Sequence, residues 1–122
     1  GIAGVYLCGC CDIYNPKTVR STMGSMFRVP FECGMSFEEV IDLMKKRGVI
    51  TYASVIDPSA QSLRDTEFEP NCAVVIGNEG SGLTQSETAL CDKRITIKMK
   101  GNINSLNAAS AAGIFLWELT KR

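Results

Sequence analysis

The stretch that decides the fold runs from residue 72 to residue 83 and reads CAVVIGNEGSGL. Its first five residues are apolar and predict a short buried strand, and glycine occupies positions 77, 80 and 82. Thr84 and Glu87 follow at the spacing of a capping box, which predicts that a helix begins there. A strand that leads through a glycine-rich turn into a helix is typical of the carboxyl edge of an open α/β sheet, where ligands bind close to the backbone.

This glycine pattern does not match the common phosphate-binding loops. A dinucleotide fingerprint has glycine at the first, third and sixth positions, whereas this stretch has glycine at the first, fourth and sixth. A P-loop requires Gly-Lys followed by Ser or Thr, which this stretch does not contain. Glu79 would also repel an anion. A nucleotide-phosphate site is therefore disfavoured, and a tight turn without a ligand is the simpler alternative.

The flanking sequence alternates between predicted strands and helices. Strands are expected at residues 2–8, 29–31, 49–55, 72–76 and 94–99. Helices are expected at 17–26, from the capping box Ser36–Glu39 to Gly48, from Thr84, and from Asn104 or Ser105 to Thr120. The last helix is apolar on most faces and is predicted to be buried. Residues 57–70 are polar and predict a loop. The order predicts an α/β domain with a largely parallel sheet flanked by helices.

Length and composition fit one domain that covers residues 1–122. The chain is 45% hydrophobic and 21% charged, with a formal net charge of zero, so it has no strongly basic character that would indicate nucleic-acid binding. It contains no histidine, which excludes Ser-His-Asp and Cys-His nucleophile pairs and histidine-ligated metal sites. No apolar run is long enough to span a membrane and no signal peptide is visible, so a cytoplasmic protein is expected.

Six cysteines are expected to be reduced and structural, as in an intracellular protein. Cys8 and Cys11 have the C-x-x-C spacing, with Cys10 between them, so a redox pair or half of a soft-metal site is the alternative. A second such cluster is absent from the sequence, and we predict no metal. Cys72, within an apolar run, is predicted to be a small core residue.

A second informative stretch, residues 95–113, reads ITIKMKGNINSLNAASAAG. It predicts a strand, a Gly-Asn loop and a helix rich in small residues. Ser105 and Asn107 would lie at the helix N-terminus, where N-capping alone could explain them.

Taken together, the two stretches resemble a known family. Residues 77–83 (GNEGSGL) and the spacing Ile-x-Met-x-Gly-x-x-x-Ser-Leu-Asn-x-x-x-Ala over 97–111 are similar to the second and third motifs of the SpoU (TrmH-like) RNA ribose methyltransferases of the SPOUT superfamily. Upstream, residues 16–30 (PKTVRSTMGSMFRVP) resemble the segment before the central helix of these enzymes. The resemblance covers essentially the whole chain.

The resemblance implies an α/β fold with a C-terminal trefoil knot that binds S-adenosylmethionine, and a homodimer with the site near its interface. The implied reaction is methyl transfer to a ribose 2′-hydroxyl of rRNA or tRNA, without a metal. The positions that match the adenine and ribose site are Gly77, Ile97 and Leu106, completed by Met99 and Gly101. Those that match the polar residues around the methyl-transfer centre are Glu79, Ser105 and Asn107.

The first motif of the family, with its catalytic arginine, has no counterpart in this sequence. We therefore expect an N-terminally incomplete domain that lacks its first strand and is inactive by itself. The alternatives are an RNA-binding or scaffold protein that kept the knot without catalysis, and a nucleotide-binding module. The densest basic segments, Lys93, Arg94, Lys98 and Lys100 and the run 45–47, could contact phosphate or could simply be solvated.

Overall fold

The structure is a computed structural model that describes residues 5–8, 31–33, 35–57, 59–77, 82–97 and 108–120. The chain divides into two compact units, residues 1–40 and 41–122. In the first unit, β1 (Val5–Leu7) and β2 (Phe31–Cys33) pair in parallel, with Val5 opposite Phe31. β1 falls within the strand predicted at 2–8, whereas β2 begins at the last residue of the strand predicted at 29–31 and continues to Cys33. The helix predicted at 17–26 lies outside the described residues.

Helix α2 (Phe37–Lys46) has the ends that its sequence predicts. The Ser36 amide donates to Glu39 Oε1 at 3.0 Å, and the Glu39 amide donates to Ser36 Oγ at 3.1 Å, which completes the capping box. Gly48 follows the helix with φ +69°, a left-handed conformation that glycine adopts without strain.

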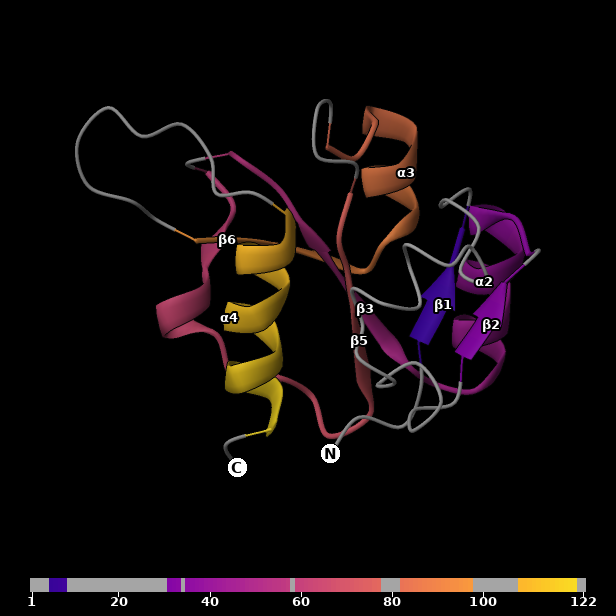
Figure 1. The fold of residues 1–122 in the computed structure, drawn as a ribbon, viewed down its shortest axis with the longest axis horizontal. Coiled ribbons are helices and arrows are strands. Elements are labelled where there is room, and N and C mark those ends of the chain that lie inside the picture. The colour runs from indigo at the N-terminus through magenta and orange to yellow at the C-terminus, as the bar shows by residue number, and fades with distance from the viewer. Residues whose placement is uncertain are drawn as a thin grey trace, which may run out of the picture. The chain divides into compact units, whose positions relative to one another are not determined.

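The second unit holds a four-stranded sheet in the order β4-β6-β3-β5 (Figure 1). Its strands are β3 (Ile50–Ser54), β4 (Gln61–Ser62), β5 (Cys72–Val75) and β6 (Lys93–Thr96). All three pairings are parallel, and β3 lies between β5 and β6. The predicted parallel sheet is therefore confirmed.

Two helices flank this sheet on opposite sides, α3 (Gln85–Leu90) and α4 (Ala108–Thr120) (Figure 1). The predicted capping box opens α3, with the Glu87 amide donating to Thr84 Oγ1 at 3.1 Å and the Thr84 amide donating to Glu87 Oε1 at 2.9 Å. On the α4 side lies the hydrophobic core, which consists of Tyr52, Leu63, Phe68, Ile95 and Phe115.

The loop predicted at residues 57–70 is wrong in part. The segment contributes the edge strand β4, a 3₁₀ helix at Leu63–Asp65 and three buried apolar side chains, Ala60, Leu63 and Phe68. The Phe68 ring meets the Tyr52 ring edge to face with centroids 4.8 Å apart, and the Tyr52 hydroxyl accepts the Glu69 amide at 3.1 Å. Three scattered apolar residues in a polar stretch carry no clear periodic signal, so their burial could not be predicted from the sequence.

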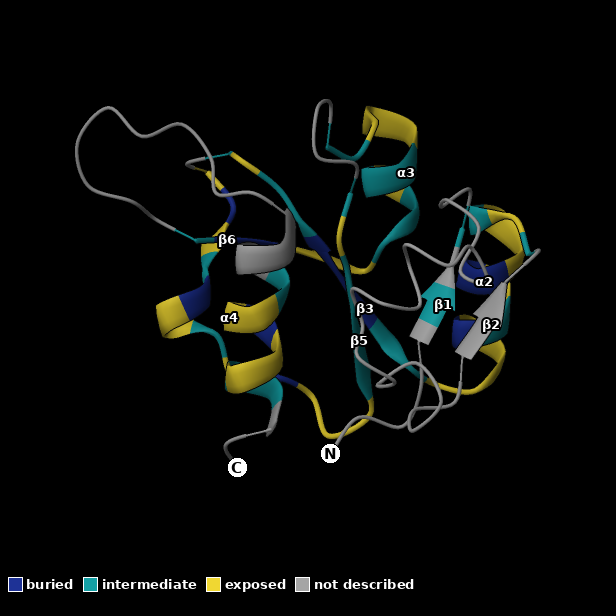
Figure 2. Cartoon of the chain, viewed as in Figure 1, coloured by how far each residue is buried: buried dark blue, intermediate teal, exposed yellow. Residues whose placement is uncertain are grey.

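The prediction that the last helix is buried is also wrong. Phe115 is only 1% exposed, but Trp117 is 68% and Ile114 is 38% exposed. Figure 2 shows that much of α4 is coloured as exposed. The reason is that α4 packs on the core through a single face, which carries Phe115 and Leu119. Apolar character on most faces of a helix therefore does not require that all of these faces are buried.

Cys72 is half-buried and packs against the core, as predicted. None of Cys8, Cys72 and Cys91 forms a disulfide, and Cys10 and Cys11 lie outside the described residues. The trefoil knot stays a prediction, because residues 98–107 also lie outside the described part of the chain. Within that part, no helix is long and apolar enough to cross a membrane.

Candidate functional site

The candidate site lies at the carboxyl edge of the four-stranded sheet. Because the strands are parallel, the chain leaves β3, β5 and β6 at the same edge, through Val55, Ile76 and Ile97. β5 leads into the glycine-rich stretch and β6 into the second motif stretch, on either side of β3. The fold thus brings the starts of the two motifs to one edge, although they are 20 residues apart in sequence.

Gly77 is the first motif residue beyond β5, and its surroundings explain why it is a glycine. A Cβ atom there would lie 2.5 Å from the carbonyl carbon of Gly82 and 2.5 Å from the amide nitrogen of Leu83. The chain therefore returns to contact Gly77 five residues later. The close neighbour of Gly77 in this structure is its own chain, whereas the sequence alone suggested the approach of a ligand.

Ile97, the second described residue of the predicted cofactor site, is half-buried and packs against the hydrophobic core. Gly77 and Ile97 thus reach the same sheet edge, and their role in cofactor binding stays a prediction. The other predicted site residues lie outside the described part of the chain, so their roles stay predictions: Glu79, Met99, Gly101, Ser105, Leu106 and Asn107.

Two site candidates that the sequence analysis missed lie at this edge. Ile56 follows β3 and is 71% exposed, and Ile76 follows β5 and is 37% exposed. The only sequence signal for Ile56 was that side chains alternate between the two faces of a strand. Ile56 is four residues beyond Tyr52 and therefore falls on the same sheet face. Their exposure, however, depends on what packs above each strand and could not be predicted.

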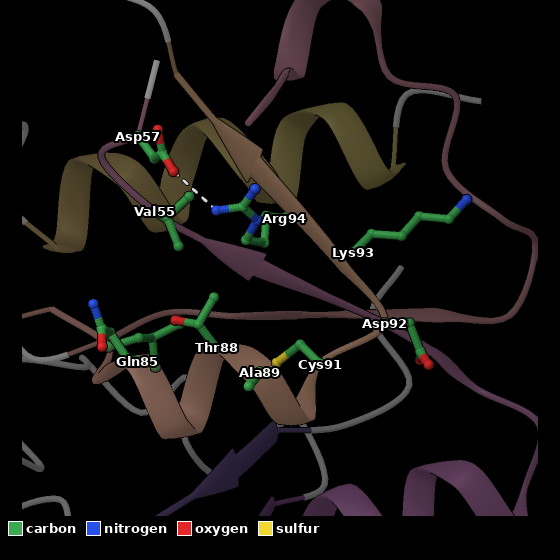
Figure 3. A pocket seen from close by; sticks show the side chains of 10 residues that line it. Val55, Asp57, Gln85, Thr88, Ala89, Cys91, Asp92, Lys93 and Arg94 are labelled. Atoms are coloured by element: carbon green, nitrogen blue, oxygen red, sulfur yellow. Dashed lines mark hydrogen bonds and ion pairs between the residues drawn. The ribbon is translucent and has the colours of Figure 1, made fainter. Parts of the chain in front are cut away.

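A cavity of about 530 Å³ lies on the other face of the sheet, between α3 and the strands (Figure 3). Val55 and Asp57 line it from beyond β3, and Arg94 lines it from β6. Arg94 Nη1 donates to Asp57 Oδ2 at 2.9 Å (Figure 3). The Ser59 amide and hydroxyl also donate to this carboxylate and, together with Arg94, hold the pKa of Asp57 below its usual range.

Cys91 lies at the same cavity but does not have the character of a nucleophile. Burial raises the pKa of its thiol, and the neighbouring carboxylates of Asp92 and Glu87 act in the same direction. A cysteine nucleophile requires the opposite shift, since the thiolate is the reactive form. Cys91 is therefore a structural thiol, in line with the expectation for the cysteines as a class.

The basic segment around β6 does not form one surface in the part that the structure describes. Arg94 faces the cavity, whereas Lys93 Nζ lies 3.7 Å from Glu69 Oε1 and 5.6 Å from the centroid of the Tyr52 ring. Each of the two side chains therefore meets a carboxylate on its own face of the sheet. Lys98 and Lys100 lie outside the described residues.

Comparison with known proteins gives one consistent result. The model of the SpoU rRNA Methylase family matches residues 1–117. A 23S rRNA (uridine(2479)-2′-O)-methyltransferase of Streptomyces viridochromogenes is 34% identical in an alignment of 127 residues that covers all of this chain and 44% of the relative.

Solved structures agree with the sequence comparison. The SpoU methyltransferase AviRb from Streptomyces viridochromogenes, in complex with the cofactor AdoMet, has a TM-score of 0.85 at 34% identity, covering 97% of this chain and 49% of the other. An AdoMet-bound rRNA methyltransferase from Sinorhizobium meliloti has a TM-score of 0.88 at 29% identity, covering 99% and 46%.

The chain spans about half the length of these relatives. The family match nevertheless extends over nearly all of its residues, and both motif stretches begin at one sheet edge. This chain belongs to the SpoU rRNA methylase family.

Proposed function

We propose that this chain is the cofactor-binding part of an S-adenosylmethionine-dependent RNA 2′-O-ribose methyltransferase that acts on rRNA or tRNA. The observation that carries the proposal is the convergence of Gly77 and Ile97 at one carboxyl edge, in a chain whose family match covers residues 1–117. The names of the relatives support the reaction, and the AdoMet-bound neighbours support the cofactor.

The described residues suit this cofactor chemically. Adenine requires an apolar surface for its face and backbone groups for its edge, and the sheet edge offers exposed isoleucines beside Gly77. Gly77, Ile97, Met99, Gly101 and Leu106 would hold the adenosine, and Glu79, Ser105 and Asn107 would orient the reacting groups. The cofactor supplies an activated methyl group, so the protein's contribution is mainly orientation. This chemistry requires no histidine.

Calorimetric titration of the 122-residue chain with S-adenosylhomocysteine tests the proposal, and we expect saturable binding. Folded protein that takes up no ligand at high concentration would contradict it. In the longer protein, Asn107→Ala and Glu79→Ala are expected to lower methyl transfer to RNA. Wild-type rates in both variants would show that the polar residues are misplaced, and an inactive longer protein that binds RNA would favour the scaffold alternative.

We also propose that the protein is a homodimer and is cytoplasmic. Trp117 and Ile114 support the first proposal, because they lie three positions apart on α4 and so share an exposed apolar face. A second copy of the chain is the occupant that the family resemblance suggests for this face. The cytoplasmic location rests on the cysteines, which are expected to be reduced, and stays a prediction.

A further inference from the structure

The chain between β3 and β4 passes from one side of β6 to the other. Ser54, the last residue of β3, pairs with Ile95 of β6, and Gln61, the first residue of β4, pairs with the same Ile95. Because β6 lies between β3 and β4 in the sheet, Ser54 and Gln61 are on opposite sides of it. Residues 55–60 therefore form a crossing segment at the end of β6 that leads into the second motif stretch.

Hydrogen bonds attach this crossing segment to the strand that it crosses. The Val55 amide donates to the Ile95 carbonyl at 2.9 Å, directly after β3. Further along the segment, Arg94 Nη1 donates to Asp57 Oδ2 at 2.9 Å, between residues 37 positions apart in the chain. The amide of Ala60, which is buried, then donates to the Asp57 carbonyl at 2.9 Å. The ion pair thus joins the middle of the crossing segment to β6.

The Asp57 carboxylate is held in position for this contact. The Ser59 amide and hydroxyl donate to Oδ1 at 2.9 and 2.8 Å, while Oδ2 accepts Arg94. Figure 3 shows the Asp57 and Arg94 side chains pointing toward one another at the cavity beside α3. An exposed ion pair usually contributes little, because two mobile side chains must be ordered. Here one partner is already ordered, so the contribution is expected near the upper end of the usual range.

We infer that Asp57 and Arg94 are positioning residues for the candidate cofactor site. Their ion pair fixes the segment that crosses β6, and thereby the end of β6 from which the site begins at Ile97. The inference rests on the proposed function for the ligand, whereas the contact itself follows from the sheet register and the hydrogen bonds. Without the pair, the crossing segment could move away from β6, and affinity falls with the fraction of molecules that keep the binding arrangement.

Calorimetric titration of the 122-residue chain with S-adenosylhomocysteine measures the effect on the site. Arg94→Ala and Asp57→Ala are each expected to weaken binding about three- to fivefold, the factor that one well-oriented exposed ion pair supplies. The double variant should bind no more weakly than Asp57→Ala, because either change removes the whole contact. Arg94→Lys keeps a positive charge beside the carboxylate and is expected to retain most of the affinity. Circular dichroism verifies that each variant is folded.

Glu69→Ala is the matched control. It removes the ion pair with Lys93, which neighbours Arg94 on β6 but meets its carboxylate on the opposite face of the sheet. The side chains of both pairs are between 40% and 50% exposed, so Glu69→Ala and Arg94→Ala should shift the urea midpoint similarly. Only Arg94→Ala should also lower the affinity.

The signs of the two single changes separate positioning from a direct effect of charge on the ligand. If Arg94 acted through its electric field on a charged ligand, Asp57→Ala would change the affinity in the opposite direction to Arg94→Ala. The ion pair predicts that both variants change the affinity in the same direction.

Hydrogen exchange measures the attachment of the crossing segment without any ligand. In Arg94→Ala, the amides of Val55 and Ala60 should exchange about three- to fivefold faster, because the segment opens more often. The amides of the β3–β5 pairing should exchange at the wild-type rate. Unchanged exchange at Val55 and Ala60 would show that the ion pair does not hold the segment, and would overturn the inference.

The outcomes also distinguish this inference from the proposed function. If the wild-type chain binds no S-adenosylhomocysteine, the proposed function fails and the positioning role fails with it. If the wild type binds and both Arg94→Ala and Asp57→Ala keep its affinity, only the positioning role is overturned. Opposite changes in these two variants, or an equal loss of affinity in Glu69→Ala, would overturn it as well.

Discussion

Gly77 lies so close to Gly82 that a Cβ atom on residue 77 would be 2.5 Å from the Gly82 carbonyl carbon and 2.9 Å from its Cα. The described ends of the glycine-rich stretch are therefore in backbone contact with each other. Backbone atoms cannot move aside as the end of a flexible side chain can, so the contact requires a glycine at position 77.

Gly77→Ala is expected to lower the free energy of unfolding by about 1–3 kcal/mol, the usual cost of overpacking. Gly113→Ala is the control, because a Cβ atom there meets nothing within 4 Å and the residue lies within α4. That change should raise the free energy of unfolding by roughly 0.5–1 kcal/mol, since alanine favours the helix. Urea denaturation measures both, and effects of the same sign would contradict the contact.

The same contact affects how binding data on Gly77 are interpreted. Gly77→Val is expected to abolish binding of S-adenosylhomocysteine, because it disturbs the stretch that would hold the adenosine. A loss of affinity would then have two explanations, a displaced glycine-rich stretch or a ligand blocked by the valine side chain. Titration at wild-type affinity would be the informative result, because it would exclude Gly77 from the cofactor site.

Thr51 and Asp92 join the starts of β3 and β6. Asp92 Oδ2 accepts the Thr51 amide at 2.9 Å and the Thr51 hydroxyl at 3.0 Å, and the Asp92 amide donates to Thr51 Oγ1 at 3.0 Å. Thr51→Val keeps the shape but removes two hydrogen bonds of a buried hydroxyl, one of them to a carboxylate, so the free energy of unfolding should fall by about 1–3 kcal/mol.

Thr88→Val is the matched control for this hydroxyl. The Thr88 hydroxyl donates to the Thr84 carbonyl, which already accepts the Thr88 amide at 2.9 Å. Chemical denaturation should therefore show a change below about 1 kcal/mol for Thr88→Val. An equal loss of unfolding free energy in the two variants would mean that the Thr51–Asp92 hydrogen bonds contribute no more to stability than the Thr88 hydroxyl does.

Phe68→Ala tests whether the segment 57–70 is part of the core. Phe68 is 7% exposed and packs on Tyr52, so its removal leaves a cavity and should cost about 3–5 kcal/mol of stability. Glu67→Ala changes an exposed neighbour and should stay within about 0.5 kcal/mol. If thermal or urea unfolding shows no loss of stability in Phe68→Ala, the segment would instead be a surface loop.

Asp57 predicts a specific acid sensitivity. Hydrogen bonds from Ser59, with Arg94 beside the carboxylate, lower the pKa of Asp57 in the folded state. Its contribution to stability is therefore present above the unfolded pKa of about 3.9 and is lost as the pH falls through the lower, folded value. Asp57→Asn should make the unfolding free energy depend less steeply on pH below about pH 4. Asp65→Asn removes an equal charge at another exposed position, and an identical pH profile for the two variants would contradict the prediction.

Trp117→Glu tests the proposed homodimer. A charge on the exposed apolar face of α4 would have to be desolvated in the interface, so the variant is expected to be monomeric in light scattering, where the wild type is expected at twice the chain mass. Gln85→Glu places the same new charge on exposed α3 and should not change the mass. A monomeric wild type would refute the dimer.

The sequence by itself determined the features that depend on residues close in the chain. The predicted capping boxes Ser36–Glu39 and Thr84–Glu87 are confirmed, with both hydrogen bonds of each box present, because their donors and acceptors are only three residues apart. Gly48 ends α2 for an equally local reason. The motif spacings, which span only a few residues each, were likewise sufficient to indicate the family that the comparisons confirm.

Only the tertiary structure decided which side chains meet across the sheet. The burial of Phe68 depends on its contact with Tyr52, and the exposure of Trp117 depends on which face of α4 packs on the core. Lys93 and Arg94 lie apart because their side chains are on opposite faces of β6. Gly77 against Gly82 and the isoleucines at the carboxyl edge follow from the same cause. All of these features depend on contacts between segments that are distant in the sequence. Such contacts contribute to stability without producing a local pattern in the sequence, so they could not be predicted from it.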